Sequence, residues 1–392
     1  MAYINLDHLS MDDINKFAVQ YYTKEYKVSN LLADWDISPS VISSVPLLIP
    51  PVSLDVECPY CHEKIKLHAP SKTDFFSLKY NALMDKYAYC NKCDHHISNC
   101  TCDNCVSKQK AVLVKKIHEQ YQFPDKDDGI NFHKLRVFPR IFIGTLLRYA
   151  SDEDITHILP YDTAFNSRNA AFPSLYPNSD QEYDIYYRKF PDLNYLIVSP
   201  LSDVNSFKLM DNGSVTYYPY KVEYIPLINE FLNQDINSIL SQPFYTSEDC
   251  DDILDFWKDL IFYECLEYFI NQIKSAGFRF SPGKKTDQMF RMLIEKYPQS
   301  KIYNVIYRCI AYAMKGYADG RFHSRIHAAN SILSSIERQF TRAVQEHWQL
   351  NDGYRSLPQS AVSTFFFQYV LPIAGKEFTT IPNMEIVKSF LK

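Results

Sequence analysis

Glycine is scarce in this chain. Only nine of the 392 residues are Gly, and none of them forms a Walker-type phosphate loop or a Gly-x-Gly-x-x-Gly pattern. The Gly-x-Ser-x-Gly turn of a serine hydrolase is absent as well. These motifs need glycine because a backbone can approach a phosphate closely, or turn sharply beside a nucleophile, only where no side chain intervenes. Their absence disfavours the usual P-loop ATPases, Rossmann oxidoreductases and serine hydrolases.

Long apolar runs are missing too. The most apolar stretch, residues 361–375, is short and contains Pro372, whereas a membrane-spanning helix needs about 20 apolar residues. The first residues lack the basic start and the apolar core of a secretory signal. We therefore expect a cytoplasmic protein without a membrane partner.

Cysteine, by contrast, is concentrated in one region. Seven of the ten cysteines lie between Cys58 and Cys105, as the pairs Cys58/Cys61 and Cys90/Cys93 followed by Cys100, Cys102 and Cys105. An odd number of clustered thiols argues against a disulfide framework, and thiolates in Cys-x-x-Cys pairs are preferred ligands of Zn²⁺. The region of about residues 55–107 resembles a zinc-ribbon or treble-clef module, which implies that the first four cysteines hold one zinc ion.

A second ion would need one more ligand besides the last three cysteines, and either His95 or His96 can supply it. We take His95 as the eighth ligand. A cross-braced arrangement, in which Cys58 and Cys61 join Cys102 and Cys105, fits the spacing equally. Four protein ligands leave no position for a reacting water, so we expect structural rather than catalytic zinc.

Charge is segregated along the chain. The net charge is −5, but residues 151–273 carry a net −15, whereas residues 104–150 carry +5 and residues 274–346 carry +8. Segregated basic stretches are typical of phosphate-binding surfaces. The alternative is that the basic helices pack on the acidic segment. The candidate nucleic-acid contacts are Lys115, Lys116, Arg308, Lys315, Arg321, Arg325, Arg338 and Arg342.

Aromatic residues alternate with these cations along the sequence, and their role has two possible interpretations. Tyrosines that can stack on bases lie close to the arginines in sequence, which suits nucleic acid. Tyrosines at helical spacing also serve as core residues. The aromatic residues concerned are Tyr303, Tyr307, Tyr312, Tyr317 and Phe322.

The expected fold is multidomain and mainly α, with a small β-containing middle segment. We expect a three-helix unit at 1–50, a zinc module at 51–107, a mixed α/β segment at 108–240 and a helical domain with a basic face at 241–392. The middle segment contains a hairpin signal, Asp211-Asn212-Gly213. In the last domain, helices are expected at 247–276, 284–297, 301–318, 323–347 and 359–371.

The three N-terminal helices resemble a helix-turn-helix. Ser10 caps the first helix, Ser38 caps a third helix and Pro46 ends it. The third helix has no Arg, Lys, Asn or Gln to read base edges. A small helical docking domain therefore fits this segment as well as a DNA reader does.

Two further constellations are weak as sites. His323 and His327 stand at i and i+4 but lack the central Glu of a zinc-protease motif. The carboxylates of residues 248–252 suit the start of a helix, where the dipole favours negative charge, better than they suit a magnesium site.

These features favour a zinc-stabilised, non-enzymatic nucleic-acid-associated protein that binds DNA rather than RNA. A helix-turn-helix beside a zinc module is similar to parts of bacterial mobile-element and phage-defence (antiviral) proteins. One alternative is a protein-interaction adaptor without nucleic-acid contact. Another is a metal-dependent nuclease or other effector whose catalytic residues are scattered in sequence.

Overall fold

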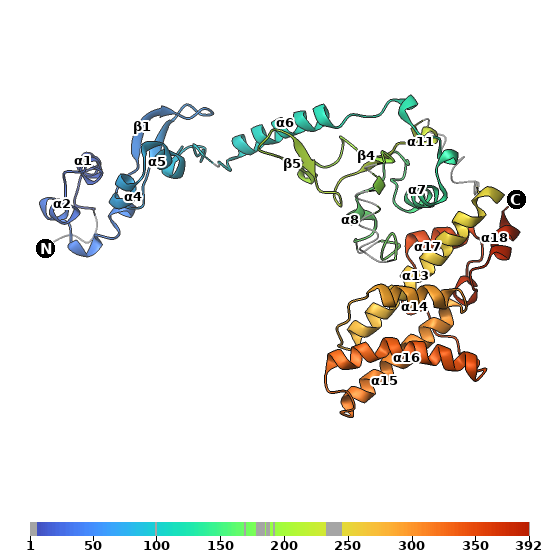
Figure 1. Ribbon diagram of the computed structural model, residues 1–392. Helices are drawn as coiled ribbons and strands as arrows, with labels where there is room; N and C mark the ends of the chain where they lie inside the picture. Colours follow the sequence, from blue (N-terminus) through green and yellow to red (C-terminus); the bar gives the residue numbers. More distant parts are fainter. Residues whose placement is uncertain are drawn as a thin grey trace. The chain divides into compact units, whose positions relative to one another are not determined.

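The computed structural model describes residues 6–98, 100–167, 170–177, 185, 189–190, 193–232 and 245–391. They belong to two compact units, Met1–Lys116 and Ile117–Lys392, whose elements are labelled in Figure 1. The chain is mainly helical with small antiparallel sheets, which confirms the expected fold class. The finer domain boundaries at residues 50, 107 and 240 stay predictions.

The first unit begins with two short helices, α1 (Met11–Tyr21) and α2 (Val28–Asp34). The Ser10 side chain caps α1, as expected, by accepting a hydrogen bond from the third residue of the helix. Phe17 on α1 is fully buried, and its ring meets the Trp35 ring edge to face at 6.1 Å. This aromatic contact packs the end of α2 against α1.

The prediction of a third N-terminal helix that ends at Pro46 is wrong. The chain forms a 3-10 turn, η1 (Pro39–Val41), and then a separate four-residue helix, α3 (Val45–Leu48). Pro46 lies in the first turn of α3, where the missing N–H of proline costs no helical hydrogen bond. Neither turn has the length of a helix that could enter a DNA groove.

A three-stranded antiparallel sheet follows, in the order β1-β2-β3. Its strands are β1 (Val52–Glu57), β2 (Lys64–Leu67) and β3 (Ala88–Tyr89), and between β2 and β3 lie α4 (Lys72–Ser77) and α5 (Tyr80–Tyr87). Leu67 pairs with Val52 on one side and with Ala88 on the other. The strand β2 therefore lies between β1 and β3.

The N-terminal helices and this sheet share one hydrophobic core, which extends from Leu6 to Cys90. The Tyr22 hydroxyl donates a 2.8 Å hydrogen bond to the Ala69 carbonyl. The Lys72 N–H donates to the Tyr21 hydroxyl at 3.2 Å. The helices therefore pack directly on the module that carries the cysteines.

The long helix α6 (Asp103–Gln120) continues from the first unit into the second. The next elements are η2 (Lys126–Asp128), η3 (Phe132–Lys134), α7 (Val137–Tyr149), α8 (Tyr161–Ala164), η5 (Val204–Ser206) and α11 (Asn229–Leu232). The strands β4 (Leu196–Val198) and β7 (Tyr224–Pro226) form one antiparallel pair, and β5 (Phe207–Leu209) and β6 (Val215–Tyr217) form another. The second pair confirms the predicted hairpin, with Gly213 at φ +80°.

The C-terminal part is a set of packed helices centred on α13, which contacts α7, α14, α15 and α18. The elements are η6 (Ser247–Asp249), α13 (Cys250–Ser275), α14 (Lys284–Ile294), α15 (Gln299–Ala318), α16 (Arg325–Gln345), α17 (Ala361–Phe365), the π-helical turn η7 (Phe366–Val370), η8 (Glu377–Thr379) and α18 (Met384–Phe390). The five expected helices are present, and α18 is an additional one. No described helix combines the length and apolar character needed to cross a bilayer.

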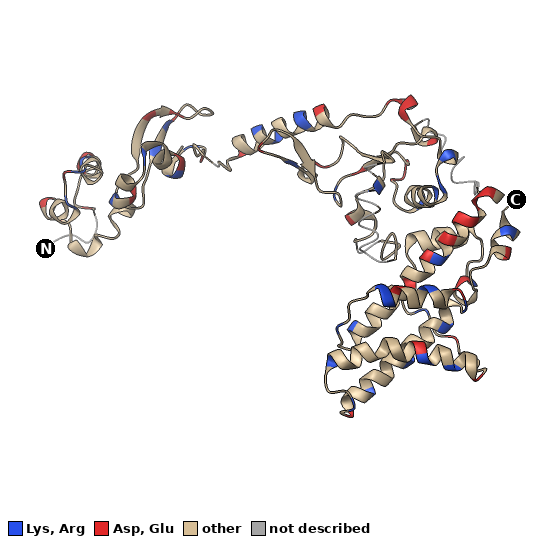
Figure 2. Cartoon of the chain, viewed as in Figure 1, with Lys and Arg blue, Asp and Glu red and all other residues tan. Residues whose placement is uncertain are grey.

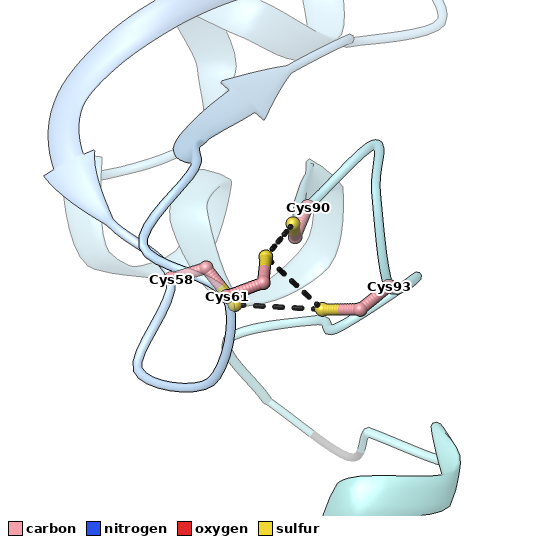
Figure 3. A group of neighbouring side chains, drawn as sticks. All are labelled: Cys58, Cys61, Cys90 and Cys93. Atoms are coloured by element: carbon pink, nitrogen blue, oxygen red, sulfur yellow. Dashed lines mark hydrogen bonds between the residues drawn. The ribbon is translucent and has the colours of Figure 1, made fainter.

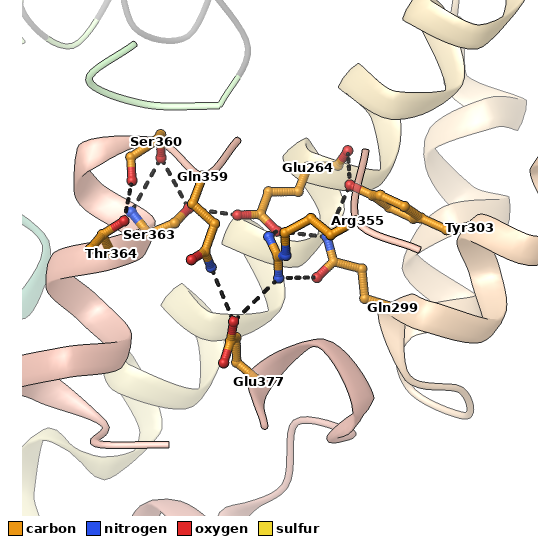
Figure 4. Close-up of polar contacts among 9 residues, drawn as sticks. All are labelled: Glu264, Gln299, Tyr303, Arg355, Gln359, Ser360, Ser363, Thr364 and Glu377. Carbon is orange, nitrogen blue, oxygen red and sulfur yellow. Dashed lines mark hydrogen bonds and ion pairs between the residues drawn. The ribbon is translucent and has the colours of Figure 1, made fainter. Parts of the chain in front are cut away.

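A buried polar network joins these helices around Glu264 (Figure 4). The Glu264 carboxylate accepts hydrogen bonds from Gln299 and Ser363, both at 2.6 Å, and from Arg355 at 3.2 Å. Arg355 also lies 3.6 Å from a carboxylate oxygen of Glu377. The network links α13, α15, α17 and η8, and buried charge is tolerated there because it is paired and hydrogen-bonded.

Candidate metal centres

The eight ligands predicted from the sequence come together in two groups of four. One group is Cys58, Cys61, Cys90 and Cys93, and the other is His95, Cys100, Cys102 and Cys105. Within each group the donor atoms all lie within 4.8 Å of one another. The grouping follows the order of the sequence, so the cross-braced alternative is not formed, and it contains His95 rather than His96.

Two turns of the same geometry build the first group. Cys58 begins the turn between β1 and β2, where its N–H donates to the Glu63 carbonyl at 2.8 Å and its carbonyl accepts from the His62 N–H at 3.1 Å. Cys90 begins the turn after β3, where the same bonds run to His95 at 2.7 Å and from Asp94 at 2.9 Å. The two Cys-x-x-Cys segments therefore form the same hydrogen-bonded loop.

Both turns also contain a residue in the left-handed region directly after the second cysteine. His62 has φ +58° and Asp94 has φ +53°. This conformation is unfavourable for most side chains, although Asp and His adopt it more often than other non-glycine residues. The repeated geometry shows that the two turns are matched in backbone as well as in cysteine spacing.

The four sulfurs of the first group lie close enough together to surround one metal ion (Figure 3). The Cys61 Sγ atom lies 3.3 Å from the Cys90 Sγ atom and 3.7 Å from the Cys93 Sγ atom. The Cys58 Sγ atom lies 3.5 Å from the Cys93 Sγ atom. A tetrahedral ion with Zn–S bonds of about 2.3 Å separates its sulfurs by roughly 3.8 Å, whereas a disulfide needs about 2.05 Å. All ten cysteines are free thiols. The donor set and its spacing fit Zn²⁺.

The second group has the Cys₃His composition of a structural zinc site. The His95 Nδ1 atom lies 3.3 Å from the Cys105 Sγ atom and 3.9 Å from the Cys102 Sγ atom. Cys105 is in the first turn of α6. An ion bound here would therefore attach the start of α6 to the turn after β3.

Two residues, His95 and Tyr60, connect the two groups, and the role of Tyr60 was not anticipated from the sequence. The His95 carbonyl closes a turn of the first group, while its ring belongs to the second. Tyr60, between Cys58 and Cys61, packs edge to face on the His95 ring at 5.1 Å, and its hydroxyl lies 3.4 Å from the Cys105 Sγ atom. Its place inside a Cys-x-x-Cys turn is the only sequence signal for this contact.

Hydrogen bonds from the backbone favour the thiolate at two of the cysteines. Burial alone would raise the pKa of Cys100, but N–H groups of Cys102 and His96 point at its sulfur and lower that pKa to about 6. Burial is likewise outweighed at Cys90, where N–H groups of Cys93 and Lys92 lower the pKa to about 7. Thiolates are the form that binds metal, so these N–H groups prepare both sites for an ion.

Seven of the eight predicted nucleic-acid contacts lie on three helices. Lys115 and Lys116 are on α6, Arg308 and Lys315 on α15, Arg325, Arg338 and Arg342 on α16, and Arg321 in the connection between α15 and α16. Arg308, Arg338 and Arg342 come together at one pocket. Arg321 does not line the pocket itself, but it lies over the ring of Tyr312, which does, and it pairs with Asp319 at 3.3 Å.

The aromatic residues of this region divide between core and surface. Tyr303 is buried, stacks on Tyr268 at 3.8 Å and donates to the Glu264 carbonyl, so it is a core residue and not a base-stacking one. Tyr307 and Tyr312 are more than half exposed. Only the surface residues are available to a nucleic acid.

The acidic run at residues 248–252 serves the local fold. Asp249 pairs with the buried Arg140 and accepts a hydrogen bond from the Thr246 N–H at 2.9 Å. Within the described residues, no third group of His, Cys, Asp or Glu donors is as closely gathered as the two cysteine groups.

No protein-family model, curated protein or solved structure matches this chain.

Proposed function

We propose that this protein is a zinc-stabilised nucleic-acid-binding protein. Two Zn²⁺ ions, one in each cysteine group, fix the first unit, and basic surfaces on α6 and on α15 and α16 contact the phosphate backbone. The zinc is structural because four protein donors surround each ion position and leave no coordination site for substrate. The observation that carries the proposal is that a basic helix begins inside the second metal cluster.

The α6 surface supports phosphate contact. Lys108 and Lys110 are exposed on this helix, one to two turns after Cys105. Figure 2 shows Lys and Arg residues along α6. No carboxylate among the described residues lies within ion-pair distance of either lysine. An ion held by Cys102 and Cys105 would thus orient a basic helix relative to the sheet of the same unit, which is the role proposed for the zinc.

The α15–α16 surface supports it as well, because several of its cations have no carboxylate of the described residues within ion-pair distance. The acidic segment does pair with some basic residues, as in Asp259 with Arg291 at 2.8 Å. In the described part of the chain, no carboxylate of the acidic segment lies within ion-pair distance of Arg308, Lys315 or Arg338. Internal pairing therefore accounts for part of the basic charge and leaves these side chains available to phosphate.

The binding proposed here is to the backbone of the nucleic acid and not to base sequence. The N-terminal segment forms η1 and α3 in place of a third helix, and neither has the length of a recognition helix. Phosphate contacts position a protein without reading sequence. Duplex DNA of unrelated sequences should accordingly bind with similar affinity.

A salt titration of DNA binding tests the proposal. The zinc-loaded protein should bind duplex DNA and lose affinity steeply between low and physiological salt, because each phosphate contact releases counterions. The double variant Lys108→Gln, Lys110→Gln should flatten the plot of log K against log salt by about 2, one for each contact. Lys24→Gln, an exposed lysine after α1, is the matched control and should leave the slope unchanged. If neither DNA nor RNA binds at low salt, the proposal is wrong and the adaptor alternative gains weight.

A further inference from the structure

A pocket of about 360 Å³ opens between α15 and α16. Arg308, Cys309 and Tyr312 line it from α15, and Ser335, Arg338 and Arg342 line it from α16. Arg308 and Tyr312 stand at i and i+4, as do Arg338 and Arg342, so each pair lies on one face of its helix. Two packed helices thus direct three guanidinium groups toward one cavity.

The pocket carries a positive charge that the described chain does not fully neutralise. No Asp or Glu lines it, and neither Arg308 nor Arg338 has a carboxylate of the described residues within 4.0 Å. Arg342 pairs with Glu346 at 3.1 Å. Three guanidinium groups and one carboxylate leave two net positive charges.

The floor of the pocket adds no negative charge. Cys309 is only 3% exposed, and burial raises the pKa of its thiol to about 11, although Arg308 and Arg338 favour the thiolate. The thiol is therefore neutral at physiological pH. Ser335 and Tyr312 also line the pocket, and their neutral hydroxyl groups can donate hydrogen bonds to an anion.

This charge matches a terminal phosphate better than a phosphate within a strand. A phosphomonoester carries about −1.5 to −2 at pH 7, whereas each phosphodiester of a strand carries a single negative charge. Guanidinium groups bind phosphate oxygens through two parallel hydrogen bonds, so converging arginines suit the several free oxygens of a monoester.

The surroundings of the pocket suit a nucleotide. Tyr312 is 53% exposed and has the Arg321 guanidinium 4.9 Å from its ring centroid, and Trp348, 40% exposed, has the Arg342 guanidinium 5.1 Å from its ring centroid, so each ring has one face paired with a cation. Exposed aromatic rings beside a cationic groove are stacking surfaces for bases. The volume lies at the small end of ligand pockets, which span about 300–1,000 Å³, and so favours one nucleotide over a longer segment.

We propose that the α15–α16 pocket binds the terminal phosphate of a nucleotide, with Arg308 and Arg338 holding the phosphate oxygens. The ligand is either a free mononucleotide or the phosphorylated end of a nucleic-acid strand, since the two present the same group. If the ligand is a strand end, this inference deepens the proposed function and rests on it. If the ligand is a free mononucleotide, the inference does not depend on that function.

Matched pairs of ligands test the inference. Adenosine 5′-monophosphate is compared with adenosine by calorimetry, and a short single-stranded DNA with a 5′-phosphate is compared with the same strand ending in a 5′-hydroxyl by fluorescence anisotropy. The full-length protein should prefer the phosphorylated member of at least one pair by about tenfold or more, because charge-assisted hydrogen bonds to the phosphate are lost in the other member.

Three variants locate the binding. Arg308→Gln and Arg338→Gln should each weaken binding of the phosphorylated ligand about tenfold. Ser335→Asp, which places a negative charge in the lining, should weaken it without removing an arginine. Arg279→Gln is the control, because Arg279 is exposed and does not line the pocket. Unchanged circular-dichroism melting shows that each variant is folded.

The outcomes separate this inference from the proposed function. If the monophosphate alone shows the preference, the pocket takes a free nucleotide and need not serve nucleic-acid binding. If the phosphorylated strand shows it, the pocket takes a strand end. If both strands bind equally and adenosine monophosphate does not bind, the pocket inference is wrong while nucleic-acid binding stands. If neither the monophosphate nor either strand binds, the pocket inference is wrong, and the duplex salt titration decides the proposed function separately.

Discussion

His62 and Asp94 show how single residues shape the first metal centre. Each follows the second cysteine of its turn and adopts a left-handed conformation, at φ +58° and +53°. The His62 side chain is 80% exposed and lies 4.0 Å from Glu57 as its closest ion-pair partner. Its importance to the turn is therefore conformational, since its side chain is not packed in the core.

This distinction gives a test at His62. His62→Gly should leave the stability of the zinc-loaded protein within about 1 kcal/mol of the wild type, because glycine adopts positive φ readily but loses more entropy on folding. His62→Val should cost about 1–2 kcal/mol, because a β-branched residue is strained there. Chemical denaturation measures both. Glu63→Val changes an exposed neighbour without positive φ and removes only an exposed 3.9 Å ion pair with Lys92, so it should cost well under about 1 kcal/mol. Equal losses at both positions would contradict the conformational explanation.

His95 and His96 are adjacent in sequence but have different surroundings. The His95 ring faces Cys102 and Cys105, whereas the His96 ring stacks on Tyr89 at 5.9 Å and lies near Asp94. The sequence left both histidines open as the eighth ligand, because cysteine spacing does not fix which of two neighbours turns inward. Only the fold separates them.

Metal analysis distinguishes the two histidines. The wild-type protein should contain two zinc ions per chain, His95→Ala should contain one, and His96→Ala should keep two. The backbone carbonyl of residue 95 still closes the turn of the first group, so the first ion should survive the His95 substitution. Loss of zinc from His96→Ala, with full zinc in His95→Ala, would reverse the assignment.

Glu267 on α13 carries a charge that the fold disfavours. Burial of its carboxyl, together with the nearby Glu264 charge, raises the pKa of Glu267 above its ordinary value. A carboxyl with a raised pKa in the folded state stabilises the fold when protonated, and that contribution is lost as the pH rises through the folded-state pKa. Ionised Glu267 therefore lowers stability at neutral pH.

Glu267→Gln should remove this effect. The melting temperature of the second unit should rise at pH 7 and change little near about pH 4, where the carboxyl is largely protonated. Thermal melts of the variant and wild type at the two pH values provide the comparison. Glu295→Gln would be a poor control because Glu295 pairs with Lys258, so Glu385→Gln, in the first turn of α18, is preferred. An equal shift at both pH values would mean that ionisation is not the cause.

At the scale of elements, Arg355 joins parts of the chain that are distant in sequence. It contacts Glu264 of α13 and Glu377 of η8, and its second terminal nitrogen donates to the Gln299 side chain at 3.4 Å. Arg355 itself lies outside any helix or strand. A single guanidinium thus fixes an irregular segment against the helical core.

Replacing Arg355 should be costly. Arg355→Leu should destabilise the second unit by about 3–5 kcal/mol, because it leaves buried carboxylates without their cation. The stability of Arg355→Lys should lie between that of the wild type and that of Arg355→Leu, since an ammonium group keeps the charge but not the bidentate geometry of the guanidinium group. Denaturation of the full-length protein measures the loss, and Arg279→Leu is the exposed control. A loss below about 1 kcal/mol would show that the carboxylates are neutralised by other means.

The sequence predicted long periodic elements better than short or long-range features. Helices α13 to α16 were predicted because their sequences combine capping residues with apolar residues that recur at helical spacing over several turns. The prediction of a third N-terminal helix was wrong because Pro46 can start a helix as well as end one. The seven-residue α18 gave too short a pattern to detect, and the network around Glu264 depends on residues up to 113 positions apart (264–377), which leave no local signal.

The metal centres were more predictable than the basic surface for the same reason. Cysteine spacing is a local pattern with a specific chemistry, so the seven cysteine donors could be named before the structure and the eighth donor could be narrowed to His95 or His96. The convergence of Arg308 and Arg338, by contrast, depends on how α15 packs on α16. Sequence could indicate that the region is basic, but it could not indicate which cations share a pocket.

At the scale of the whole molecule, the metal clusters belong to only one of the two units. Both groups lie within Met1–Lys116, and Cys58 and Cys90 are part of the core of that unit. Its strands are two to six residues long, and the core is correspondingly small. Structural zinc contributes about 10–16 kcal/mol in small domains, so the first unit should depend on metal for folding. The second unit has its own apolar core around α13.

Chelation should therefore unfold one unit and spare the other. After zinc is removed, hydrogen exchange followed by mass spectrometry should show faster exchange in peptides from residues 6–98 and unchanged protection in peptides from α13, α15 and α16. Zinc added back under reducing conditions should restore protection, whereas magnesium should not, because thiolates bind the softer ion. Equal loss of protection in α13 would show that the helical unit depends on the metal-bearing one, and unchanged exchange throughout would show that the cysteine groups fold without an ion.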